Sequence, residues 1–358
     1  MLFKNLPTPG GDEVLSSWLF RCSFNRGIKG FKRFDLYTKP ESWWKGLDLQ
    51  SLDPDVDFLA ASKRFELGSR IAQLETMERY FSFKKCNVID WKYRRFFCSD
   101  CLRDDIANGR LPVWQKNWCY EHSSICITHG RALSTLLDAS RYSKAWDAFT
   151  QICNSARSGE APIRWKIDDG WSAVVSRVEN ALVCVDRRKK TVRQKLFEKL
   201  FCIFLQTPYK GSFGGVARIH FYLERGVRFA EPDSLERSFL CGPSTADPYS
   251  RLGGLMLAAA LLGALPLSRF ELFTKIFENR MSGAVLPKDF HRAASFPSLD
   301  RSGYQSLRSF LGTFPREEFP LLDYHLRIQE DRYIRDGAFD GQRLGKSPLS
   351  SRQPNHSF

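Results

Sequence analysis

The chain has 358 residues, a net charge of +14, and 43% hydrophobic and 14% aromatic residues. This length and composition exclude a disordered chain and allow two or three domains with at least one substantial core. The ten cysteines are too few for a disulfide scaffold, and no apolar leader opens the chain, so we expect a cytoplasmic protein with reduced thiols. The positive charge indicates attraction to a polyanion, of which nucleic acid is the commonest.

Residues 1–85 predict an N-terminal helical region. Apolar spacing indicates a helix over residues 12–24, and two shorter helices begin at Asp53-Pro54 and at Ser69. Two short helices joined by a glycine-containing turn are compatible with a helix-turn-helix that contacts DNA. The alternative is that the same hairpin only packs within the domain, because any small helical domain contains one.

A segment that mixes basic and aromatic side chains precedes the cysteine-rich part of the chain. Basic groups for phosphate beside flat rings for sugar or base contacts are typical of nucleic-acid binding. Alternatively, the rings pack against the neighbouring module while the basic groups stay solvated. The predicted nucleic-acid contacts in this segment are Lys84, Lys85, Lys92, Arg94 and Arg95.

Three pairs of metal-ligating residues at a two-residue spacing lie within the predicted module of residues 86–136. They are Cys98 with Cys101, Cys119 with His122, and Cys126 with His129. Four such side chains close a tetrahedral zinc site, and a site without an open position is structural rather than catalytic. Spacing does not decide which pair joins Cys98 and Cys101, because the loop-closure entropies differ little. Gly130 slightly favours the later pair, since glycine permits the backbone that often follows a zinc knuckle.

Residues 137–332 predict a second helical region, and residues 333–358 a disordered tail rich in Gly, Ser and charge. The longest apolar run, residues 252–267, is too short and too broken by glycine and proline to span a bilayer, so we expect a buried helix and no membrane partner. A basic block adds four predicted nucleic-acid contacts. They are Arg187, Arg188, Lys189 and Lys190.

These elements predict a mainly α, multi-domain helical protein with a small zinc-ribbon-like module inserted between helical regions. The sequence lacks the His-Glu-x-x-His and Gly-x-Ser-x-Gly motifs of common hydrolases, and we expect that the protein is not an enzyme. A zinc-containing DNA-binding transcriptional regulator is one function that this composition allows.

Two islands of the chain resemble the TniQ (TnsD-like) family. The first is Cys98-Ser-Asp-Cys101-Leu, an acidic residue, a glycine and Trp114, followed by Cys126-Ile-Thr-His129-Gly. The second is the opening Pro7-Thr-Pro9, Glu13-x-Leu, Ser17-Trp-Leu and Arg21. The chain departs from the family between Trp114 and Cys126, where it carries the additional Cys119 and His122.

The resemblance implies Zn²⁺ as the cofactor and a fixed set of ligands. The implied ligands are Cys98, Cys101, Cys126 and His129. It also implies a non-catalytic adaptor that selects the target site in DNA transposition. Such an adaptor would bind DNA, an RNA-guided effector complex or both, and would recruit an AAA+ ATPase regulator and a transposase.

Overall fold

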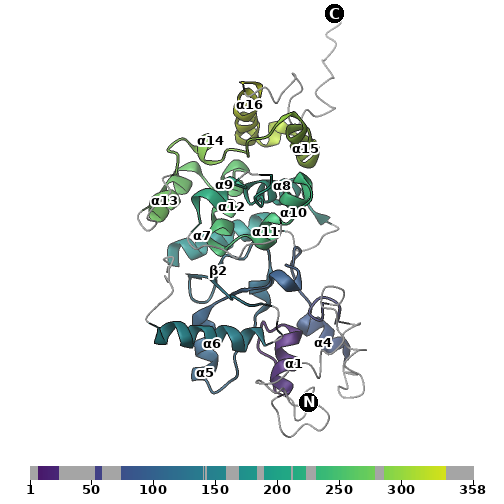
Figure 1. Ribbon diagram of the computed structural model, residues 1–358, viewed down its shortest axis with the longest axis vertical. Helices are drawn as coiled ribbons and strands as arrows, with labels where there is room; N and C mark the ends of the chain where they lie inside the picture. The colour runs from purple at the N-terminus through teal and green to yellow at the C-terminus, as the bar shows by residue number, and fades with distance from the viewer. Residues whose placement is uncertain are drawn as a thin grey trace, which may run out of the picture. The chain divides into compact units, whose positions relative to one another are not determined.

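The computed structural model describes residues 7–23, 53–58, 74–139, 141, 143–158, 169–183, 189–210, 213–222, 231–278 and 286–335. The chain divides into two compact units between Ser172 and Ala173, and each is described by itself. Both units are mainly helical (Figure 1). The predicted fold class is confirmed, with a cluster of three cysteines and one histidine inside the first unit.

The first unit contains short helices and two small antiparallel sheets. Strand β1 pairs with β4, and β2 pairs with β3. The elements in chain order are α1 (Leu15–Ser23), α4 (Leu74–Phe81), η2 (Trp91–Tyr93), β1 (Phe96–Phe97), α5 (Ser99–Ala107), η3 (Lys116–Cys119), β2 (Ile125–Cys126), β3 (Arg131–Ala132), β4 (Ser134–Thr135) and α6 (Lys144–Arg157).

Helix α1 begins three residues later than the sequence pattern predicts. The backbone before it pairs with a distant segment, because the Asp12 carbonyl accepts the Lys116 amide at 2.6 Å and Glu13 forms a β-bridge with Gln115. A residue whose backbone groups are used in this way cannot also take part in a helix. Most of the predicted helix-turn-helix, residues 59–73, lies outside the described residues.

Segments from several parts of the first unit contribute side chains to one hydrophobic core. It includes Val14 before α1, Phe97 and Trp114 of the cysteine-rich segment, and Ala148 of α6. Three of the cluster cysteines belong to the same core. Segments on both sides of the predicted boundaries at residues 85/86 and 136/137 therefore bury apolar side chains in one core. The domain boundaries themselves stay a prediction.

The second unit is built around α12, every residue of which is buried. This helix packs against α8, α9, α13 and α16. The elements are α7 (Asp169–Leu182, which spans the division), α8 (Val192–Phe204), α9 (Val216–His220), α10 (Leu235–Leu240), α11 (Gly242–Thr245), α12 (Pro248–Leu261), α13 (Leu267–Glu278), α14 (Phe290–Ala293), α15 (Arg301–Leu311), η5 (Arg316–Glu318) and α16 (Pro320–Arg335).

Helix α12 contains most of the apolar run that predicts a buried helix. It begins after Asp247, whose carboxylate accepts the amides of Tyr249 at 3.0 Å and Ser250 at 3.1 Å, and it carries a proline in its first turn. It ends before Gly263, which has a left-handed φ of 68°. Among the described residues, no helix combines the length and apolarity needed to cross a bilayer.

The last described helix extends past the predicted start of the disordered tail. Helix α16 continues to Arg335, and Tyr333 within it is fully buried and donates to the Pro297 carbonyl at 2.7 Å. This contact gives the segment a partner that its composition does not reveal. The rest of the predicted tail, residues 336–358, lies outside the described residues.

Candidate metal centre

Two adjoining turns supply four potential metal ligands. Cys98 is the N-cap residue of α5 and Cys101 lies in its first turn. Cys126 ends β2, and His129 lies in the tight turn between β2 and β3. Gly130 has a φ of 59° in this turn, a conformation that favours glycine. The short sheet formed by β2 and β3 thus holds the second pair opposite the start of α5.

The four ligand atoms are spaced as a tetrahedral metal site requires. His129 Nδ1 lies 3.5 Å from Cys98 Sγ, 3.3 Å from Cys101 Sγ and 3.6 Å from Cys126 Sγ. The Cys101 and Cys126 sulfurs are 3.5 Å apart, and all four atoms lie within 4.8 Å of one another. Tetrahedral bonds of about 2.3 Å to sulfur and 2.0–2.1 Å to nitrogen place donor atoms about 3.5–3.8 Å apart. The donor set therefore fits a four-coordinate metal ion.

The thiols influence one another's acidity. Hydrogen bonds from Cys101 and Cys98 lower the pKa of Cys126. The hydrogen bond between Cys101 and Cys126 correspondingly raises the pKa of Cys101. The thiolate is the form of cysteine that binds a metal.

The side chains of the alternative pair point elsewhere. Cys119 is fully buried and its thiol donates to the Gln115 carbonyl at 3.5 Å. The His122 ring stacks on Tyr120 with centroids 5.4 Å apart. Neither residue belongs to the group that can hold an ion. Of the pairs that spacing left open, the later one, Cys126 with His129, joins Cys98 and Cys101.

The imidazole of His129 contacts a residue that spacing does not identify. Its Nε2 lies 2.9 Å from Asp104 Oδ2, on the side opposite the sulfurs. The Asp104 side chain is 62% exposed and the His129 side chain 21% exposed. Asp104 lies about one turn after Cys101 on α5, and only the orientation of the histidine ring could have revealed its role.

The N-terminal polar residues of the family resemblance form a buried network. The Glu13 carboxylate accepts hydrogen bonds from the Gly10 amide at 2.8 Å, the Ser17 hydroxyl at 2.9 Å and Arg21 Nε at 3.0 Å. Trp18 Nε1 donates to the Pro7 carbonyl at 2.8 Å. These contacts hold the extended segment before α1, residues 7–13, against the helix.

This network also contacts the cysteine-rich segment. The Trp114 amide donates to the Ser17 hydroxyl at 3.0 Å, and the Val14 amide donates to the Trp114 carbonyl at 3.0 Å. The Asp105 carboxylate accepts the Val113 amide at 3.0 Å just before this tryptophan. The two islands of sequence that carry the family resemblance are thus in direct contact.

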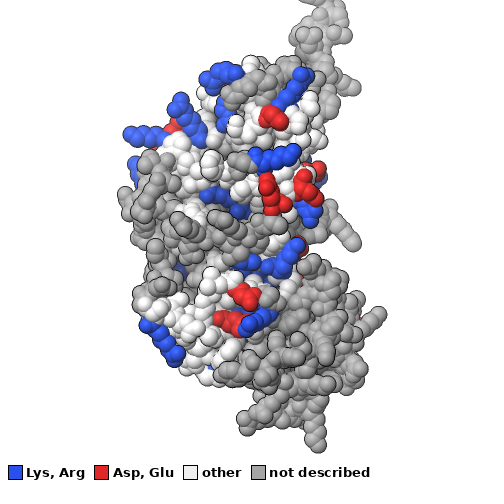
Figure 2. All heavy atoms as spheres, in the orientation of Figure 1, with Lys and Arg blue, Asp and Glu red and all other residues white. Residues whose placement is uncertain are grey.

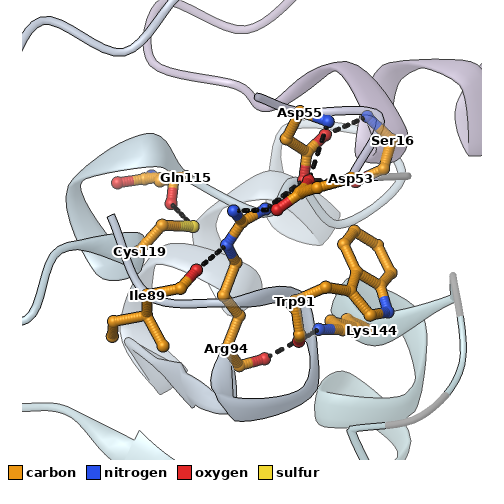
Figure 3. A network of polar contacts seen from close by, with 9 residues as sticks. All are labelled: Ser16, Asp53, Asp55, Ile89, Trp91, Arg94, Gln115, Cys119 and Lys144. Atoms are coloured by element: carbon orange, nitrogen blue, oxygen red, sulfur yellow. Dashed lines mark hydrogen bonds and ion pairs between the residues drawn. The ribbon is translucent and has the colours of Figure 1, made fainter. Parts of the chain in front are cut away.

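Arg94, predicted to contact nucleic acid, is instead buried in an ion-pair network (Figure 3). Its side chain is 1% exposed. Nε donates to the Ile89 carbonyl at 2.6 Å, and Nη1 donates to Asp53 Oδ1 and Asp55 Oδ2, each at 3.0 Å. Asp55 also accepts the Ser16 amide at 2.7 Å. Because its guanidinium is enclosed by carboxylates, Arg94 has no surface to offer a phosphate.

The other predicted basic contacts of this unit differ in exposure. Arg95 is buried at 8% exposure and donates to the Lys92 carbonyl at 3.5 Å. Like Arg94, it is therefore not accessible as a phosphate contact. Lys84 and Lys92 are exposed, and Lys85 is half-buried. Lys84 and Lys92 thus lie on the surface of this unit.

The basic block of the second unit is only partly described. Lys189 is exposed, and Lys190 Nζ pairs with Glu198 Oε1 at 2.6 Å. Arg187 and Arg188 lie outside the described residues. On the face shown in Figure 2, Lys and Arg side chains are interspersed with Asp and Glu, so the described part of that face carries no large patch of one sign.

A buried lysine adjoins the Arg94 network, and sequence reasoning does not find it. Lys144 is 3% exposed, and its Nζ donates to the carbonyls of Trp91 at 2.7 Å and Arg94 at 3.0 Å. Burial, reinforced by the charge of Arg94, lowers the pKa of Lys144 to about 7. The cavity beside it has a volume of about 10 Å³, enough for about one water molecule and too small for a substrate.

No family model, curated protein or solved structure matches this chain. The resemblance to the TniQ family therefore stays a prediction. The geometry supports a closed four-ligand metal centre within a helical unit.

Proposed function

We propose that the protein is a non-catalytic adaptor for target-site selection in DNA transposition, of the TniQ (TnsD-like) type. The observation that carries this proposal is the contact between Ser17 and Trp114, which joins the two islands of family resemblance in one core. If the two sequence islands resembled the family only by chance, there would be no reason for them to contact each other in the fold. Contact between them is expected if both belong to one family domain.

We further propose that the metal is zinc. Three thiolates and one imidazole in tetrahedral spacing are a common structural zinc site, and soft thiolate donors disfavour Mg²⁺ and Ca²⁺. Four protein ligands leave no open coordination position, so a zinc ion here would stabilise the fold without activating water.

DNA and a protein complex are the proposed partners. The net charge of +14 favours a polyanion. Two of the predicted lysines lie near aromatic rings, with Lys92 Nζ 4.8 Å from the Tyr93 ring centroid and Lys85 Nζ 5.8 Å from that of Tyr120. Positive groups beside flat rings suit a phosphate backbone with its sugars or bases. An AAA+ ATPase regulator, a transposase and an RNA-guided complex remain proposed protein partners.

The decisive experiment is reconstitution with the gene products encoded beside this protein. We expect the purified chain to bind a neighbouring AAA+ ATPase in a pull-down and to direct insertion to one site in a transposition assay. A chain that binds no ATPase but dimerises on a palindromic DNA site would instead be a zinc-containing transcriptional regulator.

DNA contact is tested separately by a salt titration. We expect DNA affinity to fall steeply with salt, and the substitution of Lys84 and Lys92 by Ala to reduce the slope by about one to two units. The control substitutes Arg237 and Arg327, which are exposed but paired with Asp233 and Asp323. A flat titration, or equal slopes for both variants, would exclude these lysines as phosphate contacts.

A further inference from the structure

The hydrogen bond between Asp104 and His129 joins the two halves of the candidate metal centre. Asp104 lies on α5, the helix that begins with Cys98 and carries Cys101. His129 lies in the turn that follows Cys126. The 2.9 Å contact between Asp104 Oδ2 and His129 Nε2 is therefore a link between the helix and the turn that is independent of any ion.

We propose that Asp104 is a positioning residue that holds the His129 ring with Nδ1 toward the thiolates. A neutral imidazole carries one proton, and a metal ligand needs its lone pair on the coordinating nitrogen. Because Nδ1 faces all three sulfurs at 3.3–3.6 Å, the proton belongs on Nε2. There it is donated to the Asp104 carboxylate, which fixes both the tautomer and the ring orientation.

His129 is the ligand that most needs such support. The three cysteines are between 1% and 6% exposed and belong to the hydrophobic core. The His129 side chain is 21% exposed, so its ring has fewer packing contacts to hold it. Without Asp104, the ring could rotate away from the thiolates or place its proton on Nδ1, and either change would weaken metal binding.

The alternative is an ordinary surface ion pair. An exposed pair contributes little to stability, and its loss would change stability to the same small extent with or without metal. A positioning role instead weakens metal binding while the fold of the metal-loaded protein is kept. The two roles are therefore separated by metal affinity and by the spectrum of a bound probe ion.

The experiment uses the full-length protein and rests on the proposed metal site. The protein is stripped of metal and titrated with Co²⁺, whose visible spectrum reports tetrahedral thiolate coordination, and zinc affinity follows by competition. We expect Asp104→Ala to bind zinc about 10- to 100-fold more weakly. Asp104→Asn should recover most of the loss, since its amide oxygen still accepts from Nε2–H.

The matched control is Asp100→Ala. Asp100 lies on the same helix and pairs with Arg131 at 2.7 Å, a contact between α5 and β3 that does not involve a ligand. We expect its zinc affinity to stay within about twofold of the wild type. Circular dichroism of each variant at saturating zinc verifies folding.

Equal zinc affinities and cobalt spectra for Asp104→Ala and the wild type would overturn the positioning role. An equal loss in Asp100→Ala would also overturn it, because the effect would then belong to helix packing. A wild-type chain that binds neither ion would overturn the metal site together with this inference. Failure to bind DNA or an ATPase would overturn the adaptor function alone.

Discussion

The buried guanidinium of Arg94 compensates two carboxylates that have little access to water. Burial raises the pKa of Asp55 to about 6 even though Arg94 opposes the shift. We expect Arg94→Met to destabilise the protein by about 3–5 kcal/mol, because it leaves buried charge without a partner. Urea unfolding measures the change.

Two further variants check this explanation. Adding Asp53→Asn and Asp55→Asn to Arg94→Met removes the uncompensated charge and should recover part of the loss. Arg103→Met breaks a partly exposed pair with Asp100 at 3.7 Å and should cost less than about 1 kcal/mol. If Arg94→Met cost no more than Arg103→Met, the network would not be buried in solution.

The buried amine of Lys144 makes stability depend on pH. Its pKa falls from 10.5 to about 7 on burial, so between these values the unfolded chain binds more protons than the folded chain. Its contribution to folding stability therefore rises with pH from 7 to 10.5, by up to about 1.4 kcal/mol per pH unit.

The variant Lys144→Met isolates this contribution. The variant loses the hydrogen bonds to Trp91 and Arg94, which lowers the free energy of unfolding by the same amount at every pH. The increase in the free energy of unfolding between pH 7 and 10.5 should disappear in this variant. Urea unfolding of both proteins at pH 7, 8 and 9 measures the difference. Parallel stability curves for the two proteins would mean that Lys144 stays charged in the folded state.

The choice between the two cysteine pairs gives a third prediction. We expect Cys126→Ser to lose the metal, because it removes one of four ligands. Cys119→Ser should keep one equivalent of bound metal per chain, since the thiol of Cys119 lies outside the cluster and donates to the Gln115 carbonyl. Elemental analysis of both purified proteins measures this, and the reverse ranking would make the earlier pair the ligands.

At the scale of residues, the sequence predicted the cluster of three cysteines and one histidine better than the exposure of the basic side chains. A spacing of two residues restricts where side chains can point, so Cys98 and Cys101 are recognisable locally. The burial of Arg94 depends on Asp53 and Asp55, about 40 residues earlier in the chain. A basic residue in a sequence shows its charge but not whether carboxylates from elsewhere enclose it.

Among the helices, the contact of α12 with α9 depends on Gly253. A Cβ atom at Gly253 would lie 2.2 Å from the ring of Phe221, which is fully buried and stacks on Phe273. We expect Gly253→Ala to destabilise the second unit by at least about 1–3 kcal/mol, because neither ring can move freely.

Gly254→Ala is the matched control in the same helix. Its Cβ would meet the side chains of Leu205 and Phe201 at 3.2–3.4 Å, which requires only a small adjustment. Thermal unfolding of both variants should show a clearly larger loss for Gly253→Ala. Similar melting temperatures would mean that α9 shifts easily relative to α12.

Helices were predictable from sequence where a long apolar run meets a local start signal. Asp247-Pro248 supplies the cap and first turn of α12, and the apolar residues after it require burial. The strands escaped prediction because each has only two residues, too few to show an alternating pattern. The start of α1 depends on the bridge between Glu13 and Gln115, which no local pattern reveals.

For the whole first unit, the shared core predicts that metal removal acts beyond the ligands. Cys98, Cys101 and Cys126 pack in the same core as Val14 and Ala148. We expect a chelator to increase amide hydrogen exchange in α1 and α6 as well as in α5, because loss of bound metal lowers the stability of everything that unfolds with it.

Exchange in α12 is the internal control, since this helix belongs to the second unit. We expect its protection to change less than that of α6. An increase confined to residues 98–132 would show that the metal module opens by itself. The predicted division of residues 1–332 into three regions would then describe the dynamics of the chain better than the two compact units do.

The buried contacts of Glu13, Ser17 and Arg21 affect how mutational screens should be interpreted. These positions are the most recognisable part of the N-terminus, yet their side chains bind one another and the backbone. Alanine at any of them would lower the yield of folded protein and so mimic a lost interaction. A search for the docking surface should therefore vary exposed residues of the same unit, such as Lys84 and Lys92, and score expression level alongside phenotype.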